Sequence, residues 1–138
     1  AWRRRSEGLP DGGTAVWLGD SMGEMAAYYA FADLAFIGGS LLPLGGQNLI
    51  EAAACGCPVL VGPHTFNFQR ATEDALAAGA AQRVADADAL MLTVDCLFSA
   101  KTSLAAMRAA AGEFAAAHRG ATQRTLALIE RFPGRAGR

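Results

Sequence analysis

Residues 38–51 read Gly-Gly-Ser-Leu-Leu-Pro-Leu-Gly-Gly-Gln-Asn-Leu-Ile-Glu, and they join a short apolar run at 34–37 to an apolar segment that begins at Leu49. A continuous apolar run of this length is typical of a strand buried on both faces. The glycines allow the backbone to turn and to approach a ligand closely. Asn48 and Glu51 stand where a helix should begin, so free N–H groups and the positive helix end would face that ligand. The segment therefore predicts an anion-binding corner, with a phosphate as the commonest occupant.

The composition limits the classes of protein to which the chain can belong. It has 138 residues, 52% of them hydrophobic, which predicts one domain with a substantial core. A formal charge of -1, from 12 basic and 13 acidic residues, disfavours nucleic-acid binding. No apolar run approaches the roughly 20 residues that span a bilayer, and no secretion signal follows the basic start, so we expect a soluble polypeptide. The three cysteines lack C-x-x-C spacing and predict buried free thiols in a reducing compartment.

Strand-like and helix-like segments alternate along the chain. Strands are expected at 14–18, 34–37, 59–61 and 81–84, and helices at 22–32, 49–54, 68–78, from Asp86 to about 98, from Ser99 or Thr102 to about 118, and around Leu126, Leu128 and Ile129 up to Pro133. This alternation predicts an α/β fold, a Rossmann-like parallel sheet flanked by helices. Loops 19–23, 38–48 and 62–67 should then gather at the carboxyl edge of that sheet, where ligands bind. Residues 133–138 are expected to form a disordered tail.

Two helix starts carry the same ambiguity between capping and binding. Ser21 and Glu24 have the spacing of a capping box, which needs no ligand, and we favour that interpretation on spacing alone. As a binding site, Gly23 would let a ligand lie against the backbone, and Glu24 would accept hydrogen bonds from a base or sugar. At Asn48 and Glu51 the two interpretations are about even, because a carboxylate beside a phosphate corner is suited to two ribose hydroxyls.

Other motifs are weaker or absent. Neither G-x-G-x-x-G nor a P-loop occurs, which argues against a dinucleotide oxidoreductase or a P-loop NTPase. His64, at the predicted ligand edge, either bonds an anion or simply packs in its loop. Residues 3–5 are basic, and we expect a solvated face there. No metal-ligand spacing and no G-x-S-x-G elbow is present, so the sequence indicates a binding surface more clearly than a catalytic one.

Several unusual strings of the chain occur together and in one order. In that order the chain resembles the 3-deoxy-D-manno-octulosonic acid (Kdo) transferases. The strings are Asp20–Met25, Tyr28–Ala30, Ala32–Asp33, Phe36–Ser40, Pro43–Asn48, Glu51 and Gly62–Phe68. The resemblance covers roughly residues 2–129 and is weaker around 118–122.

The resemblance implies a fold and a reaction. It implies the glycosyltransferase-B arrangement of two Rossmann-like domains, with residues 1–132 as the donor-binding carboxyl-terminal domain, truncated at its N-terminal side. The intact enzyme would transfer Kdo from CMP-Kdo to lipid A precursor in lipopolysaccharide inner-core biosynthesis, at the cytoplasmic side of the bacterial inner membrane. It would invert the anomeric carbon and use neither a metal ion nor another cofactor.

The resemblance also assigns residues. Met22, Gly23 and Glu24, together with Asn48, Leu49, Ile50 and Glu51, match the segments expected to bind CMP-Kdo. Glu51 would hold the ribose hydroxyls and the Asn48 helix start the phosphate. Gly39 and Ser40 would line the same pocket, and His64 is a more remote candidate beside Kdo. The donor motif Pro-Arg-His and the general-base glutamate of the family precede the point where this chain begins, so no catalytic residue is expected here and the chain alone should be inactive.

Two alternatives remain open from the residues themselves. One is a nucleotide-sugar-binding domain of another glycosyltransferase-B enzyme or of an epimerase that uses a UDP-sugar. The other is a non-catalytic α/β interaction module in which the polar loop residues only cap helices.

Overall fold

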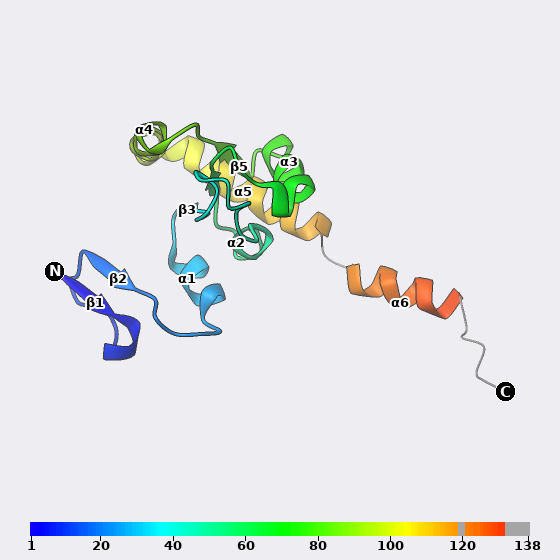
Figure 1. Ribbon diagram of the computed structural model, residues 1–138, viewed down its shortest axis with the longest axis horizontal. Coiled ribbons are helices and arrows are strands. Elements are labelled where there is room, and N and C mark those ends of the chain that lie inside the picture. Colours follow the sequence, from blue (N-terminus) through cyan, green and yellow to red (C-terminus); the bar gives the residue numbers. More distant parts are fainter. Residues whose placement is uncertain (119–120, 132–138) are drawn as a thin grey trace.

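The computed structural model describes residues 1–118 and 121–131 and shows strands and helices that alternate along most of the chain (Figure 1). The elements are β1 (Trp2–Arg4), η1 (Arg5–Glu7), β2 (Val16–Leu18), α1 (Met25–Phe31), β3 (Ala35–Phe36), α2 (Ile50–Ala54), β4 (Val59–Val61), η2 (Phe66–Phe68), α3 (Gln69–Ala77), β5 (Ala81–Arg83), α4 (Ala87–Ser99), α5 (Lys101–His118) and α6 (Ala121–Arg131). The α/β class is therefore confirmed. The tail expected at 133–138 lies outside the described residues.

The strands form two parallel sheets, whereas we expected one. β3, β4 and β5 pair in that order, with Ala35 opposite Val59 and Val59 opposite Ala81. α2 connects β3 to β4 and α3 connects β4 to β5, so this sheet consists of two βαβ units. β1 and β2 form a separate pair.

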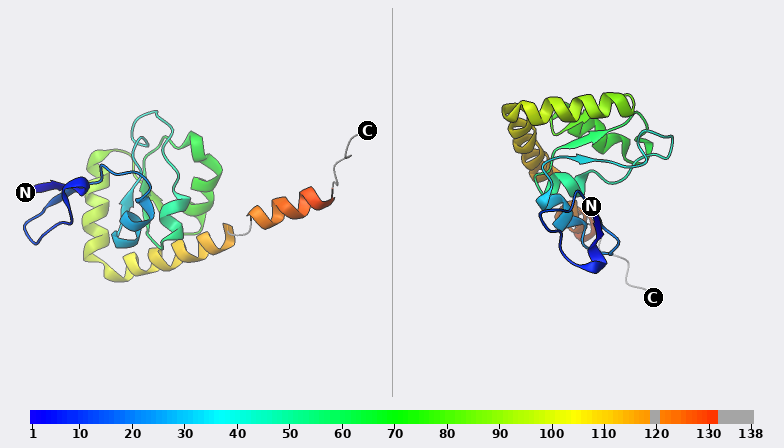
Figure 2. Two further views of the ribbon diagram at one scale, coloured as in Figure 1. Left: turned by 90° about the horizontal axis from the view of Figure 1, so that it is seen from below. Right: turned by 90° about the vertical axis from the view of Figure 1, so that its left-hand side faces the viewer.

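The core lies around β4, the central strand of the larger sheet. Val59, Leu60 and Val61 are all 0% exposed, as a continuous apolar run in a parallel sheet should be. α5 crosses the back of this unit beside α2, and its buried residues Ala111, Phe114 and Ala115 join the same core (Figure 2). The alanine-rich sequence lets these helices approach closely. β3 is less enclosed than predicted, because Phe36 is 38% exposed although Ile37 is buried.

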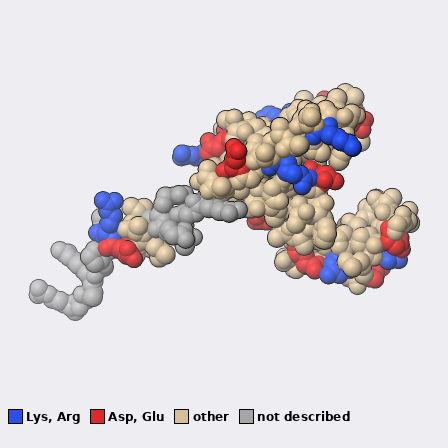
Figure 3. All heavy atoms as spheres, turned by 180° about the vertical axis from the view of Figure 1, so that it is seen from behind, with Lys and Arg blue, Asp and Glu red and all other residues tan. Residues whose placement is uncertain are grey.

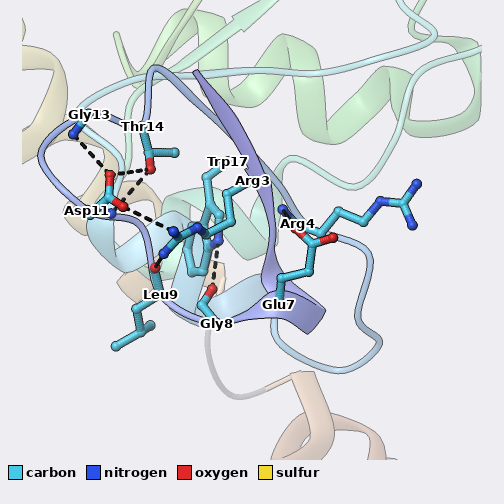
Figure 4. A network of polar contacts seen from close by, with 9 residues as sticks. All are labelled: Arg3, Arg4, Glu7, Gly8, Leu9, Asp11, Gly13, Thr14 and Trp17. Carbon is cyan, nitrogen blue, oxygen red and sulfur yellow. Dashed lines mark hydrogen bonds and ion pairs between the residues drawn. The ribbon is translucent and has the colours of Figure 1, made fainter.

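The smaller sheet at the N-terminus was not expected, since residues 3–5 were interpreted as a solvated basic face. Polar contacts hold it together, as Figure 4 shows. Arg3 pairs with Asp11 at 3.1 Å and donates to the Leu9 carbonyl at 2.9 Å, while Trp17 Nε1 donates to the Gly8 carbonyl at 3.2 Å. A run dominated by arginine has no apolar pattern that predicts a strand. The contacts that hold this strand are made with residues outside the run, and a local pattern does not reveal them.

Several helix boundaries follow the expected chemistry and one does not. Asp86 caps α4, its Oδ1 accepting from the Ala89 N–H at 2.8 Å, as predicted. The first helix begins at Met25, three residues later than expected, because Gly23 adopts φ +80° just before it. Leu126, Leu128 and Ile129 are exposed along α6, which extends away from the sheets (Figure 1).

The three cysteines differ in how deeply they are buried. The three cysteines are free, but only Cys57 is buried, whereas Cys96 is exposed and Cys55 lies between, so the expectation of buried thiols was wrong for Cys96. Burial raises the pKa of the Cys57 thiol.

On the face shown in Figure 3, basic and acidic side chains are interspersed. Among the described residues no single helix is long and apolar enough to cross a membrane, although α4 and α5, bent by 101° at their junction, pass that test as a pair.

Candidate functional site

Two of the three predicted loops meet at the carboxyl edge of the larger sheet. The His64 N–H donates to the Ser40 carbonyl at 2.9 Å, and the Asn67 N–H donates to the Gly45 carbonyl at 3.2 Å. The Asn67 side-chain amide adds a bond to the Leu44 carbonyl at 3.2 Å. Loops 38–48 and 62–67 therefore form one surface. The loop at 19–23 follows β2, which belongs to the other sheet, and it reaches the site by way of α1 instead.

Ser40 joins these two loops from the inside. Its side chain is fully buried, and its hydroxyl donates to the Ile37 carbonyl at 2.5 Å and accepts the Gly62 N–H at 2.8 Å. A side chain at position 62 would collide with the main chain of Ser40 and Leu41. The buried Ser40 side chain thus links the two loops from the interior. Gly39, at φ +72°, forms the turn just before it.

The start of α2 is organised by Asn48. Its Oδ1 accepts the Ile50 N–H at 3.1 Å, and its Nδ2 donates to Glu51 Oε1 at 3.1 Å. Asn48 therefore satisfies one N–H at the helix start, but the N-cap is Leu49, where no side chain caps, and Glu51 bonds the Asn48 amide rather than a backbone N–H. The capping box that the spacing of Asn48 and Glu51 allows does not form. Leu49 is buried in the core and Ile50 packs partly against it, so the side chains of these two residues support the helix start.

A pocket of about 450 Å³ lies between α1 and α2 and is lined by Gly23, Met25, Ala26, Glu51, Ala54 and Cys55. It brings together two predicted binding segments, since Gly23 comes from one and Glu51 from the other. The Cys55 thiol donates to the Ala26 carbonyl at 3.5 Å and ties the two helices together. Burial, and after it the charge of Glu51, raises the pKa of the Tyr29 hydroxyl.

Glu24 lies elsewhere. Its carboxylate pairs with Arg5 at 2.9 Å and accepts a bond from the Ser21 hydroxyl. These contacts, the Ser21 bond first, lower the pKa of Glu24. It lines a smaller cavity of about 120 Å³ with Trp17, Tyr28 and others.

The capping box predicted for Ser21 and Glu24 is wrong. The two side chains bond each other, and no side chain caps the first N–H groups of α1. Met22, between them, is 97% exposed. The segment 22–24 therefore divides between two sides of α1, with Gly23 alone of its residues in the pocket that contains Glu51.

Sequence reasoning missed Arg83, at the end of β5. Its guanidinium donates to the carbonyls of Gly62 and Pro63 at 3.0 and 3.3 Å and to Thr65 Oγ1 at 3.4 Å, and it pairs with Glu73 at 2.7 Å. These contacts form one wall of a pocket of about 380 Å³, lined by Pro63, His64, Thr65, Phe66, Gln69, Glu73 and Arg83. A signal was available, because Arg83 lies near the carboxyl end of the strand predicted at 81–84, where ligand-edge residues are expected. His64 lines this pocket rather than the one containing Glu51.

Across the described residues, no group of three or more His, Cys, Asp or Glu side chains is arranged to hold a metal ion. The geometry therefore provides a surface formed by two hydrogen-bonded loops and a pocket between α1 and α2 that contains the Glu51 carboxylate. It also provides a second pocket, one wall of which is formed by the contacts of Arg83.

Comparison with known proteins gives specific matches. No protein-family model matches the chain. It is 52% identical over 136 residues to a 3-deoxy-D-manno-octulosonic acid transferase of Bordetella pertussis, covering 97% of this chain and 32% of that protein. A protein of the same name from Haemophilus influenzae is 40% identical over 131 residues, covering 94% of this chain and 31% of that protein. The chain thus spans about a third of the length of these relatives.

A solved structure also matches. The crystal structure of the C-terminal CMP-Kdo binding domain of WaaA from Acinetobacter baumannii superposes with a TM-score of 0.75 and 33% sequence identity. The match covers 80% of this chain and 58% of that domain.

Proposed function

The chain is homologous to the carboxyl-terminal part of Kdo transferases, and on that basis we propose that it is the donor-binding part of such an enzyme. The observation that carries the proposal is the match to a domain described as binding CMP-Kdo, together with 52% identity over nearly the whole chain to a named transferase. The intact enzyme would transfer Kdo from CMP-Kdo to lipid A precursor in lipopolysaccharide synthesis. It would work at the cytoplasmic side of the inner membrane, with the acceptor bound through a further domain.

The donor would contact the pocket between α1 and α2 and the loop edge beside it. Glu51 is suited to the ribose because an ionised carboxylate accepts two hydroxyl protons, and Asn48 already holds one of its oxygens in place. Gly23, on the opposite wall, offers a backbone without a side chain. Asn48 and Gly39 would approach the phosphate, while Ser40, Leu49 and Ile50 would act by supporting the loop and helix start. Met22 and Glu24 remain candidates on the outer side of α1.

The chain is expected to bind the donor without carrying out the transfer. An inverting transfer requires a base that removes the proton of the acceptor hydroxyl. None of the residues assigned here has that role, so the purified chain should bind donor without transferring Kdo. Transfer of Kdo to a lipid A precursor by the purified chain would contradict this part of the proposal.

An amide-shift titration tests donor binding directly. Adding CMP to the labelled chain should shift the backbone amides of Gly23, Asn48 and Glu51, while the start of α4 at Ala87 serves as a distant control. UDP should leave the same amides in place. A response to UDP but not to CMP would favour the UDP-sugar alternative, and a response to neither would favour the interaction module; the comparisons favour neither of these.

Glu51→Gln tests the ribose contact with little change in shape. Glutamine keeps the oxygen that accepts from Asn48, so the fold should be retained, but the second ionised acceptor is lost. Hydrogen bonds to charged groups contribute about 1.5 to 3 kcal/mol, so we expect CMP to bind about tenfold or more weakly. Glu113→Gln, an exposed glutamate of α5, is the matched control and should leave the affinity unchanged. Equal affinity in both variants would remove Glu51 from the site.

A further inference from the structure

Arg83, at the end of β5, is bonded to three places in loop 62–67. Its Nη1 donates to the Gly62 and Pro63 carbonyls at 3.0 and 3.3 Å and to Thr65 Oγ1 at 3.4 Å. Its Nη2 pairs with Glu73 of α3 at 2.7 Å. Because a guanidinium presents its donors in a rigid planar fork, these contacts together fix the path of the loop relative to the sheet.

Loop 62–67 in turn holds loop 38–48. Apart from bonds to the residues just before it, the stretch 40–46 is hydrogen-bonded only to loop 62–67 within the described part of the chain. The two loops also pack closely, because a Cβ at Gly45 would collide with the Asn67 side chain. The position of loop 38–48 therefore depends on that of loop 62–67.

Within residues 1–118 and 121–131, Arg83 is the one side chain from outside the two loops that is hydrogen-bonded to loop 62–67. It thus ties the pair of loops to β5. We propose that Arg83 is a positioning residue for the donor, a role that rests on the proposed function. It does not line the pocket that contains Glu51, but it fixes loop 38–48 and thereby the helix start at Asn48, where that loop ends.

This effect on the donor is geometric rather than electrostatic. Glu73 neutralises the guanidinium of Arg83, and the pair is partly exposed, so salt screens the field that remains. A loop that contains glycines has many other conformations once it is released. Arg83 raises the fraction of molecules in which loop 38–48 has the binding conformation, and the apparent affinity for the donor falls in proportion to that fraction.

A double variant with unchanged net charge tests the role of Arg83. Arg83→Gln together with Glu73→Gln removes the ion pair, and we expect CMP to bind about fivefold more weakly or worse. The matched control is Arg3→Gln together with Asp11→Asn. Arg3 also pairs with a carboxylate and donates to a backbone carbonyl, and its side chain is 39% exposed against 32% for Arg83. The control should lose a similar amount of stability and no affinity for CMP.

Arg83→Lys separates the fork from the charge. Lysine keeps a positive charge opposite Glu73 but offers a compact ammonium in place of the planar fork. It cannot reach all the acceptors of loop 62–67 in the same way, so we expect CMP to bind about twofold to fivefold more weakly than to the unaltered chain. Full affinity in this variant would contradict the proposal.

Backbone amide exchange follows the loops without any nucleotide. The Asn67 amide, which donates to the Gly45 carbonyl, reports on the contact between the two loops. In the double variant of Arg83 and Glu73 it should exchange about fivefold faster or more. The Val59 amide, in the buried strand β4, should exchange at the same rate as in the unaltered chain.

The outcomes separate a positioning role from a general loss of stability. Unchanged exchange at Asn67 would overturn the proposal, and so would an equal acceleration at Val59, because the variant would then have destabilised the whole domain. Unchanged CMP affinity in a variant whose loops exchange faster would also overturn it. If the unaltered chain binds no CMP, the proposed donor site fails, and exchange at Asn67 still decides whether Arg83 holds the loops.

Discussion

The two sheets of this molecule are stabilised in different ways. The sheet of β3, β4 and β5 has a strand with no exposed side chain, packed between helices. The pair of β1 and β2 has an exposed apolar face and is held by ion pairs and hydrogen bonds to its own loop. The larger sheet therefore forms a hydrophobic core from the chain's own residues, whereas the apolar residues of the smaller sheet lie on the surface.

The largest effect should come from emptying the core of the larger sheet. Leu60→Ala removes a fully buried side chain from β4 and should lower the free energy of unfolding by about 2 to 5 kcal/mol. Leu18→Ala, the same change on exposed β2, should cost less than about 1 kcal/mol. Chemical denaturation followed by circular dichroism measures both values. Equal losses would show that the two sheets do not differ in the proposed way.

A change at the loop junction should rank next. Gly62→Ala places a methyl group against the main chain of Ser40, which cannot move without breaking the Ser40 bonds, so we expect a loss of about 3 kcal/mol. Gly38→Ala, with open space around it, is the control and should change stability by less than about 0.5 kcal/mol. If the two variants unfold at the same denaturant concentration, the junction is not rigid.

Acid should loosen the small sheet before the large one. Bonds from the Ser6 hydroxyl and N–H lower the pKa of Asp20, and bonds from the Thr14 hydroxyl and the Gly13 N–H lower that of Asp11. Because the folded values are lowered, this stabilisation is present above the unfolded pKa of about 3.9 and is lost as the pH falls through the folded values. Below about pH 4 the protection factors of the Ser6 and Gly13 amides, measured against the unfolded chain at the same pH, should fall before that of the Leu60 amide.

The same titration contains its own control. Asp20→Asn should remove the acid response at Ser6 and leave that at Gly13. Simultaneous loss of protection in β1 and β4 would mean that the two sheets unfold as one unit.

The smallest effect is expected at the joint between the regions. Arg5 and Glu24 link η1 to α1, but each side chain is about one third exposed, so Arg5→Gln should cost no more than about 1 kcal/mol and less still in high salt. Denaturation in low and high salt measures this. A larger loss that does not depend on salt would show that this pair anchors the small sheet.

The same contrast explains what could be predicted from the sequence. The run Val59-Leu60-Val61 predicted its strand correctly, because burial on both faces leaves a continuous apolar signature. Asp86 predicted a helix start for an equally local reason. Trp2, Arg3 and Arg4 gave no such signal, since their strand depends on partners up to Leu18.

The candidate site was predictable to a similar extent. The bond from the Ile50 N–H to Asn48 follows from the place of Asn48 just ahead of the helix, whereas Glu51 bonds the Asn48 side chain and not the backbone N–H that its spacing allowed. The burial of Ser40 and the role of Arg83 depend on bonds to Gly62, about twenty residues away in sequence, and periodicity carries no information on such pairs. The division between Glu24 and Glu51 arises in the same way, from the ion pair with Arg5.

The bond between the Ser40 hydroxyl and the Gly62 N–H also has a consequence for sequence variation. Position 62 can accept a side chain only if the chain at 40 takes another path, and position 40 can lose its hydroxyl only if another group accepts the buried N–H. Neither position can therefore be substituted alone, so among natural variants of this domain the two residues should change together or be retained together.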